Sequence, residues 1–259
     1  MFEGVHDKLP DIMGYLDRLG INEILEPTRE NLDKLVYAHL THIPYENLEY
    51  CIEKSCPDLT IGGLYNKLVL KKRGGYCFEL NGLLGWLLRE LGYQVTDYMA
   101  RYLRGESTIP MRRHRVLKVV ATDGTWICDV GIGEVAPRLP IRLEEHTVQE
   151  QYGETYRLTK DPFLGWVLED LHHGKWRNFY AFTEEPQLNV DFIAPSFYCE
   201  KHPDSPFTSQ EMFSLKTAEG RITLDGNVFK RFSDGSVEAR ELQTAAEMQE
   251  AYRQFGLEK

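Results

Sequence analysis

The sequence predicts an α+β fold, and three observations along the chain support this prediction. The first third of the 259 residues carries helical hydrophobic patterns between prolines, and the middle consists of short runs rich in β-branched and aromatic residues. The last part combines hairpin-like runs with a terminal helix. We therefore expect a helical region over residues 1–92, a β-rich region over 93–205 and a mixed α/β region over 206–259.

Two helices are predicted most clearly in the first region. The stretch "TRENLDKLVYAHLTH" has apolar residues near a 3.6-residue period, and Thr28 is a suitable N-cap. A second helix has leucines that recur at i, i+3, i+4, i+7, i+8 and i+11 from Leu80, and it ends at Gly92. A pair of glycines precedes its first turn, so Cys77 lies at or near the N-terminus of this helix.

The middle region has runs that are typical of strands, such as "YQVTDYMARYL", "RVLKVVAT", "TWICDVGIG" and "GWVLEDL". Turn signals that include Asp123-Gly124 separate them. Residues 189–207 indicate an aromatic, proline-bearing connection. Two hairpin-like runs follow over 219–232 and 233–242, and the last predicted element is a helix over 242–256.

Composition excludes several classes of protein. The net charge of −10 argues against a nucleic-acid-binding protein, because phosphate contacts need a surplus of Lys and Arg. No apolar run reaches membrane-spanning length, and the stretch "MFEGVHDKLPDIMG" lacks the apolar core of an export signal. Five cysteines, an odd number, indicate reduced thiols in the cytoplasm. Their spacing does not suit a zinc site, so we expect no metal.

Cys77 is a candidate nucleophile. A thiol at a helix N-terminus lies at the positive end of the helix dipole, and this position favours the thiolate. Backbone N–H groups without helical partners could hold the oxyanion that forms when the sulfur attacks a carbonyl. The alternative is a small residue that packs beneath the leucine face, because buried cysteine is common. Position alone does not separate these interpretations.

A nucleophilic cysteine needs a histidine to take its proton and a carboxylate or amide to orient that histidine. His114 begins one strand-like run and Asp129 ends the next, so a hairpin could bring them together. A two-residue Asp123-Gly124 turn would leave His114 four residues, or about 13 Å, from the position that faces Asp129. A bulge, a longer loop or a bend is then required. Alternative partners are His42, His172 and His173.

Residues 100–115 concentrate positive charge in an otherwise acidic chain. Such a cluster suits a substrate whose phosphates lie away from the reacting atom, and a solvated loop with ordinary charges is the alternative. The arginines are Arg101, Arg104, Arg112, Arg113 and Arg115. The nearby "GIGEVA" formally matches the dinucleotide-binding fingerprint, but Pro137 and Pro140 interrupt the helix that should follow, so we reject that interpretation.

Several motifs together resemble the arylamine N-acetyltransferases. They are "HIPYENL" at 42–48, "NKLVLKKRGGYCFELN" at 66–81, "RRHRVLKVV" from residue 112 and "WICDVGIG" at 126–133. The segments "YAFTEEP" and "HPDSPF" are similar to later landmarks of the family. The resemblance covers residues 10 to 230, and R-G-G-x-C-x-E-x-N followed by H and D-V-G-x-G is highly specific as a combination.

The resemblance implies a fold and a reaction. The fold would be related to the papain and transglutaminase cysteine enzymes, with a helical bundle, a β-barrel-like domain and a C-terminal α/β lid. A Cys77–His114–Asp129 triad would move an acetyl group from acetyl-CoA, through an acetyl-cysteine, to an arylamine or arylhydrazine. The coenzyme phosphates give Arg104, Arg112 and Arg113 a possible purpose. A cytoplasmic enzyme of xenobiotic metabolism is implied, and we expect a monomer or a small homo-oligomer.

Other residues receive expectations from the same resemblance. Asn81 would support Asp129, and Arg73 and Glu46 would form a structural ion pair. Ile132 replaces a common aromatic residue, which puts the preferred amine in doubt, and Phe207 is a candidate pocket aromatic. Two further departures from the family pattern are Ser196 and Glu200.

Two other classes of protein fit the same residues. A cysteine hydrolase or a transglutaminase-like amide transferase would use the same three side chains and differ only in what its cleft admits. A catalytically silent binding protein would keep the fold, and its Cys77 would react with iodoacetamide no faster than a free thiol. The intact Cys, His and Asp set argues against the silent protein.

Overall fold

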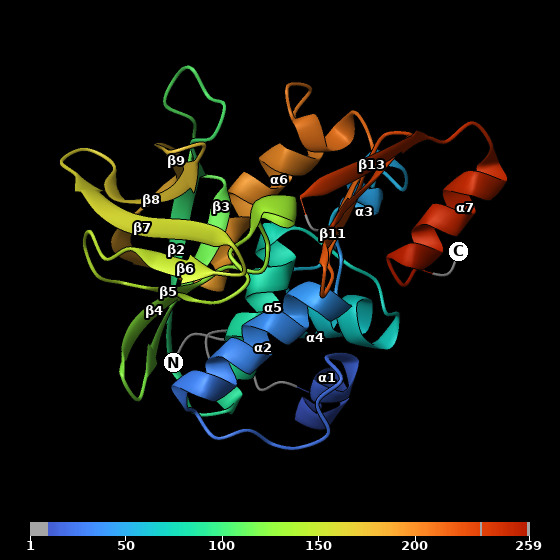
Figure 1. The fold of residues 1–259 in the computed structure, drawn as a ribbon. Coiled ribbons are helices and arrows are strands. Elements are labelled where there is room, and N and C mark those ends of the chain that lie inside the picture. Colours follow the sequence, from blue (N-terminus) through green and yellow to red (C-terminus); the bar gives the residue numbers. More distant parts are fainter. Residues whose placement is uncertain (1–9, 234, 258–259) are drawn as a thin grey trace.

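The structure, a computed structural model, describes residues 10–233 and 235–257 and has three parts (Figure 1). Helices form the N-terminal part, an eight-stranded sheet the middle, and a five-stranded sheet with a helix the C-terminal part. The predicted α+β fold is confirmed. Residues 1–9, which include most of the stretch tested for an export signal, lie outside the described residues.

The helical part is built around α5 (Cys77–Glu90), whose leucines face a core shared with the other helices. Thr28 caps α2 (Arg29–His42) by accepting a hydrogen bond from the backbone N–H of Asn31 at 3.2 Å, as predicted. The other elements are α1 (Ile12–Arg18), α3 (Leu48–Cys51), α4 (Ile61–Tyr65) and the π-helical turn η1 (Asn66–Leu70). None of the helices among the described residues is long and apolar enough to cross a membrane.

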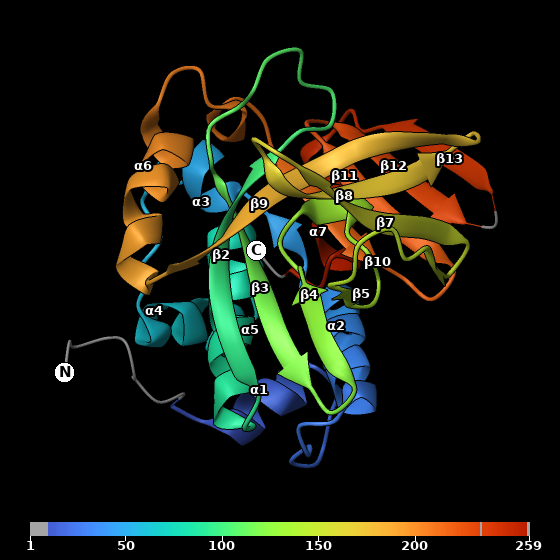
Figure 2. The same cartoon turned by 90° about the vertical axis from the view of Figure 1, so that its left-hand side faces the viewer.

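The large antiparallel sheet packs on α5 through β2 and β3 (Figure 2). Its strand order is β5-β4-β3-β2-β9-β8-β7-β6. The strands are β2 (Gln94–Tyr102), β3 (His114–Ala121), β4 (Gly124–Cys128), β5 (Ile141–Arg142), β6 (Gln149–Gln151), β7 (Glu154–Asp161), β8 (Gly165–His172) and β9 (Lys175–Gln187). Strands β2 and β3 run beside α5, so the residues at their ends can lie near its first turn.

Two glutamine side chains join the edges of this sheet. Gln149 accepts a hydrogen bond from the backbone N–H of Arg142 at 2.6 Å and donates one to its carbonyl at 3.2 Å. Gln151 binds the backbone of Leu139 in the same way, at 2.5 and 3.2 Å. Each amide supplies one donor and one acceptor, as a paired backbone residue would. The sheet is therefore nearly closed into a barrel.

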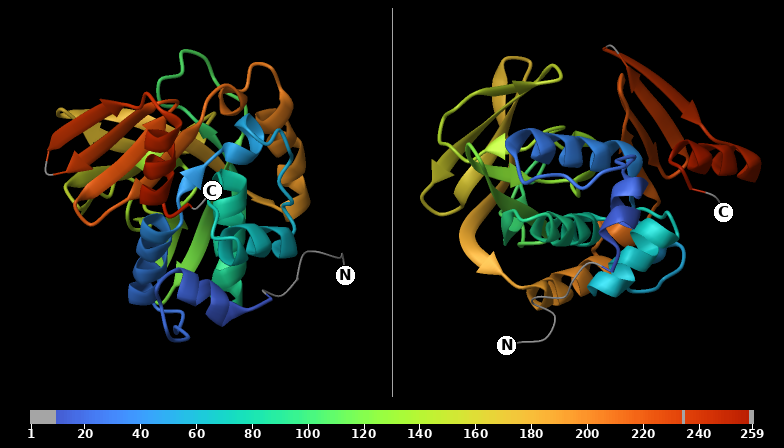
Figure 3. Two further views of the ribbon diagram at one scale, coloured as in Figure 1. Left: turned by 90° about the vertical axis from the view of Figure 1, so that its right-hand side faces the viewer. Right: turned by 90° about the horizontal axis from the view of Figure 1, so that it is seen from below.

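The smaller sheet has the order β1-β10-β11-β12-β13, and β1 (Tyr45–Glu46) comes from the helical part. This pairing ties the C-terminal part to the segment that precedes Cys77. Helix α7 (Ala245–Gln254) packs on the outer face of the sheet (Figure 3). The predicted hairpin-like runs contain β11 (Gly220–Asp225), β12 (Val228–Ser233) and β13 (Ser236–Glu241), and β10 (Met212–Lys216) precedes them as a strand that was not predicted.

The segment from 189 to 207 is more regular than the predicted connection. It contains the short turn η3 (Asn189–Phe192), the helix α6 (Ile193–Lys201) and the turn η4 (Pro206–Thr208). Pro195 suggested an interruption, but it lies in the first turn of α6, where a backbone N–H has no helical partner to lose.

Candidate active site

Cys77 is the first residue of α5, as expected, and it is only 5% exposed. Tyr76 is the N-cap, and Glu79 reaches back from the first turn to accept a hydrogen bond from the backbone N–H of Tyr76 at 3.2 Å. This bond satisfies a backbone donor that the helix itself cannot satisfy. The start of the helix, and with it the position of the sulfur, is fixed by a side chain in the same turn.

Glu79 is held in turn by two partners from earlier elements. Its carboxylate accepts hydrogen bonds from the Tyr50 hydroxyl at 2.5 Å and from Lys67 Nζ at 2.7 Å. Burial raises the pKa of Glu79, and the Lys67 ammonium acts in the opposite direction. Lys67 also pairs with Glu49. The network therefore connects α3 and η1 to the first turn of α5.

The segment before Cys77 packs tightly against β1. A Cβ atom on Gly74 would lie 2.2 Å from the carbonyl oxygen of Pro44, so no other residue fits there. Arg73 forms ion pairs with the fully buried Glu46 at 2.9 Å and with Glu53 at 2.9 Å. The predicted Arg73–Glu46 pair is confirmed, and it anchors the approach to the helix.

His114 and Asp129 are brought together by a register that differs from the predicted one. Leu117 lies opposite Cys128, so the turn residues are 122 and 123. The register predicted from an Asp123-Gly124 turn is therefore wrong. In the observed register, the position facing Asp129 is two residues from His114 on the same face, about 7 Å along the strand. The side chains span this separation, and His114 Nε2 lies 2.7 Å from Asp129 Oδ2.

Asn81, one turn into α5, holds the Asp129 loop. Its Nδ2 donates to Asp129 Oδ1 at 2.9 Å and to the carbonyl of Arg115 at 2.7 Å, and its Oδ1 accepts from the backbone N–H of Val130 at 2.9 Å. The backbone N–H of Gly131 also donates to Asp129 Oδ1, at 2.9 Å. The expected support of Asp129 by Asn81 is confirmed. Both carboxylate oxygens are thus bound, which fixes the orientation of the carboxylate.

The buried sulfur needs a proton acceptor to become a thiolate. Burial raises the pKa of the Cys77 thiol well above its ordinary value, and the nearby Cys199 adds to this effect. Backbone N–H groups of Arg115 and Phe78 act in the opposite direction but do not reverse it. The helix N-terminus alone therefore does not ionise Cys77, contrary to the simplest reading of its position.

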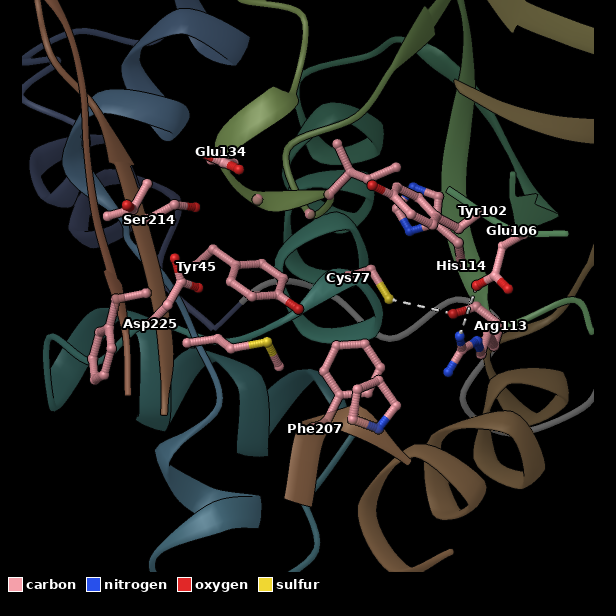
Figure 4. A pocket seen from close by; sticks show the side chains of 17 residues that line it. Tyr45, Cys77, Tyr102, Glu106, Arg113, His114, Glu134, Phe207, Ser214 and Asp225 are labelled. Atoms are coloured by element: carbon pink, nitrogen blue, oxygen red, sulfur yellow. Dashed lines mark hydrogen bonds and ion pairs between the residues drawn. The ribbon is translucent and has the colours of Figure 1, made fainter. Parts of the chain in front are cut away.

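A pocket of about 330 Å³ opens beside Cys77 (Figure 4). Its wall includes Cys77, His114, Ile132 and Phe207, so the structure brings these four predicted residues together. Ile132 precedes the short turn η2 (Gly133–Val135), which forms part of the same wall. The other lining residues are Tyr45, Tyr102, Glu106, Arg113, Gly131, Gly133, Glu134, Pro206, Met212, Phe213, Ser214, Thr223 and Asp225.

Comparisons with known proteins agree with the motifs. The N-acetyltransferase family model matches residues 28–258. The arylamine N-acetyltransferase of Mycobacterium tuberculosis strain H37Rv is 36% identical, and the match covers 91% of this chain and 85% of that protein. That of Mycolicibacterium smegmatis is 35% identical, with 96% and 92% covered. The chain belongs to the arylamine N-acetyltransferase family.

Solved structures of the family share the architecture. The Mycobacterium smegmatis arylamine N-acetyltransferase has a TM-score of 0.89 at 35% identity, with 96% of this chain and 92% of that chain covered. The Mycobacterium marinum enzyme in complex with CoA has a TM-score of 0.88 at 35% identity, with 95% and 92% covered. The cysteine-enzyme-like fold expected from the resemblance is therefore confirmed for this family member.

The arginines of this family member are distributed unevenly around the pocket. Arg113 lines it, with Nη2 3.7 Å from Glu106. Arg104 and Arg112 do not line it, and they pair with Asp170 at 2.6 Å and with Glu185 at 3.4 Å. Arg115, which the sequence grouped with them, is 1% exposed and bonds to Asp97 and Asn189. Arg115 is thus a structural residue that holds β3 to its neighbours.

The alternative histidines lie elsewhere. His42 Nδ1 is 2.9 Å from the carbonyl of Ala38 at the end of α2. His172 and His173 are adjacent at the turn between β8 and β9, where both are exposed. Neither location provides a contact with Cys77 or Asp129, which leaves His114 as the histidine of the pocket.

The two departures from the family pattern form a buried contact beneath Tyr76. The Tyr76 hydroxyl lies 2.5 Å from Ser196 Oγ and donates to Glu200 Oε1 at 3.3 Å. Ser196 and Glu200 also bond to each other. They therefore connect α6 to the N-cap of α5, which gives these two positions a structural explanation.

The sequence missed the residues that the smaller sheet contributes to the pocket. Met212, Ser214, Thr223 and Asp225 come from β10 and β11, more than 130 positions after Cys77. Their only signal was alternation, because polar residues recur at every second position along both segments, of which only the second lay in a predicted hairpin-like run. That pattern is usual for a solvent-facing side of a sheet, so it did not indicate a site.

Proposed function

We propose that this protein transfers an acetyl group from acetyl-CoA to the nitrogen of an arylamine or arylhydrazine, through an acetyl-cysteine at Cys77. The observation that carries the proposal is the Cys77 sulfur at the helix N-terminus in one pocket with His114, whose Nε2 is 2.7 Å from Asp129. Relatives named arylamine N-acetyltransferase support this donor and acceptor class, and a similar structure contains CoA.

In the first half-reaction, His114 takes the proton of the Cys77 thiol. Because burial raises the pKa of that thiol, the transfer depends on stabilisation of the imidazolium, which the Asp129 carboxylate provides. The thiolate attacks the carbonyl carbon of the acetyl thioester. The bond from that carbon to the coenzyme sulfur breaks, and the coenzyme thiolate takes the proton from His114 as it leaves.

In the second half-reaction, the amine nitrogen attacks the acetyl carbonyl on Cys77. An arylamine is largely unprotonated at neutral pH, so its lone pair is available without a strong base. The carbon–sulfur bond breaks, the amide forms, and His114 returns the amine proton to the Cys77 thiolate. Backbone N–H groups at the start of α5 would stabilise the oxyanion in both halves.

The walls of the pocket suit an aromatic acceptor. Ile132 and Phe207 line it, and the aromatic ring of Tyr45 lies on another side (Figure 4). We propose that Ile132, in place of a common aromatic residue, leaves more width on the acceptor side. For the coenzyme phosphates, Arg113 is the candidate because it lines the pocket, whereas Arg104 and Arg112 do not line it. Phosphate would have to displace the carboxylate partners of these arginines.

Steady-state kinetics test the proposed mechanism. Initial rates of product formation are measured while acetyl-CoA and 4-methylaniline are both varied, and the acetylated amine is identified by mass. A double-displacement mechanism predicts parallel lines in the double-reciprocal plot. Intersecting lines would indicate a ternary complex and would contradict the acetyl-cysteine. Release of acetate, with no acetylated amine at any amine concentration, would instead indicate a hydrolase.

A further inference from the structure

The β10–β11 ladder has an unusual inner face. Its outer face is apolar and packs against α7 in the core of the C-terminal part. The inner face would ordinarily meet water, yet several of its polar residues are almost completely buried. It presents three cross-strand pairs in succession, Met212 with Asp225, Ser214 with Thr223, and Lys216 with Arg221.

The middle pair places two hydroxyl groups in the pocket wall. Thr223 is 2% exposed, and its Oγ1 has no hydrogen-bond partner among the described residues. Ser214, its cross-strand partner, is 7% exposed and lines the same pocket. A buried hydroxyl without a partner is unfavourable, and such groups in native proteins usually await a ligand or water. The pair therefore forms a polar spot in an otherwise largely apolar wall.

A short loop links this spot to the nucleophile. A Cβ atom on Gly131 would lie 2.5 Å from the Cα of Cys77, and a Cβ atom on Gly133 would lie 3.5 Å from Ser214 Oγ. Two residues of chain span at most about 7 Å. Cys77 and the hydroxyl pair thus lie beside opposite ends of the same three-residue segment, and the pair is on the side of the pocket where Figure 4 shows Ser214, Asp225 and Glu134.

Charge at this end of the pocket restricts what can bind there. Asp225 and Glu134 both line it, and Glu134 pairs with Arg221 at 3.1 Å. Burial raises the pKa of Asp225, and the Glu134 carboxylate adds to that effect. Two carboxylates repel a third and accept hydrogen bonds, so this end favours a group that donates hydrogen bonds.

We propose that Ser214 and Thr223 form a specificity subsite that binds a hydrogen-bond donor, such as a hydroxyl or amino substituent, on the acceptor ring opposite its reacting nitrogen. The inference rests on the proposed acetyl transfer and names its acceptor class. Ring substituents that cannot form hydrogen bonds fill the same space without satisfying Thr223. An acceptor-only substituent offers no hydrogen to the carboxylates of Asp225 and Glu134, and a carboxylate is repelled by them.

The test compares acceptors that differ at one substituent. Wild-type kcat/KM is measured for 4-aminophenol, 4-methylaniline and 4-methoxyaniline. The methyl group matches the hydroxyl in size, and the methoxy group donates electrons to the ring similarly but carries no hydrogen-bond donor. We expect 4-aminophenol to exceed both by about tenfold, the effect of one good hydrogen bond. We expect 4-aminobenzoate to be poorer than 4-methylaniline. Equal values for the first three in the wild type would overturn the proposal without any variant.

Two variants assign the preference to the hydroxyl. Thr223→Val keeps the shape of the side chain but removes Oγ1, and it should reduce the ratio of 4-aminophenol to 4-methylaniline about tenfold. Thr223→Ser keeps the hydroxyl and should keep the ratio. A Thr223→Val variant that slows both amines equally, with the ratio unchanged, would show a merely structural role and overturn the proposal.

The first half-reaction distinguishes failure of this proposal from failure of the proposed function. The rate of Cys77 acetylation by acetyl-CoA, with no amine, is measured in the wild type and both variants. If Thr223→Val slows this step and leaves the ratio of 4-aminophenol to 4-methylaniline unchanged, the hydroxyls contact acetyl-CoA and not the amine. The proposed acceptor subsite is then wrong. If the wild type forms no acetyl-cysteine at all, the proposed function fails first.

Discussion

Gly131→Ala would separate the nucleophile from the loop that orients the histidine. A Cβ atom at position 131 would lie 2.5 Å from the Cα of Cys77, whereas ordinary contacts begin at 3.4 Å. The first turn of α5 and the Asp129 loop must therefore move apart by about 0.9 Å. A misplacement of about 1 Å can cost about 100-fold in rate, so we expect Cys77 acetylation to slow by about that factor. Overpacking should also lower the free energy of unfolding by about 1–3 kcal/mol.

The assay is rapid-mixing measurement of coenzyme release in the absence of amine, with urea unfolding on the same samples. Gly62→Ala is the matched control, because a Cβ atom on Gly62 meets nothing within 4 Å. In helix α4 this control should keep the acetylation rate and gain up to about 1 kcal/mol of stability. A Gly131→Ala variant that acetylates within threefold of wild type would refute the close-packing argument.

Three further predictions concern single residues. Asp129→Asn should keep the fold but slow acetylation by about 10⁴-fold, because the imidazolium loses its balancing charge; the rate of coenzyme release measures this. Arg73→Met should lower the free energy of urea unfolding by about 3 kcal/mol, since buried Glu46 loses its charged partner, and an unchanged midpoint would contradict this. Buried His39 has a pKa lowered to about 3, first by burial and then by Arg18 and His42, so the folded protein binds fewer protons than the unfolded chain below pH 6.5. The free energy of unfolding therefore decreases as pH falls. His39→Leu should reduce this decrease between pH 7 and pH 5 by about 2 kcal/mol, and an equal decrease in both proteins would contradict the prediction.

The local features of the site could be predicted from the sequence because they depend on short-range patterns. The leucine spacing after Leu80 and the stop at Gly92 define α5, and they place Cys77 at its start. The cap at Thr28 follows from one side chain and its neighbouring backbone. These elements involve residues within a few turns of each other, so periodicity and capping rules were sufficient.

Tertiary contacts could not be predicted in the same way. The hairpin that carries His114 and Asp129 turns one residue earlier than the Asp123-Gly124 signal suggested. This shifts the cross-strand pairing by two residues, so the position facing Asp129 is 116 and not 118. The helix α6 was hidden by Pro195, which is harmless in a first turn. Thr223 enters the pocket only because β1 pairs with β10 and places the smaller sheet against the site. No local pattern specifies that pairing.

The protonation of Cys77 shows where position and environment disagree. Its place at the start of α5 favours the thiolate, but burial raises the pKa of the thiol. In the proposed mechanism, His114, which Asp129 holds in the same pocket, takes the proton. The proposed ionisation therefore depends on the whole arrangement, which the sequence indicated only through its combination of motifs.

The most direct test of acetyl transfer is the mass of the protein after incubation with acetyl-CoA and no amine. The proposed mechanism predicts one added acetyl group, located by peptide mapping on the peptide that contains Cys77. The adduct should be absent in Cys77→Ser and should disappear from the wild type when an arylamine is added, with formation of the acetylated amine. An unmodified wild-type protein, or an adduct that persists in Cys77→Ser, would contradict the account.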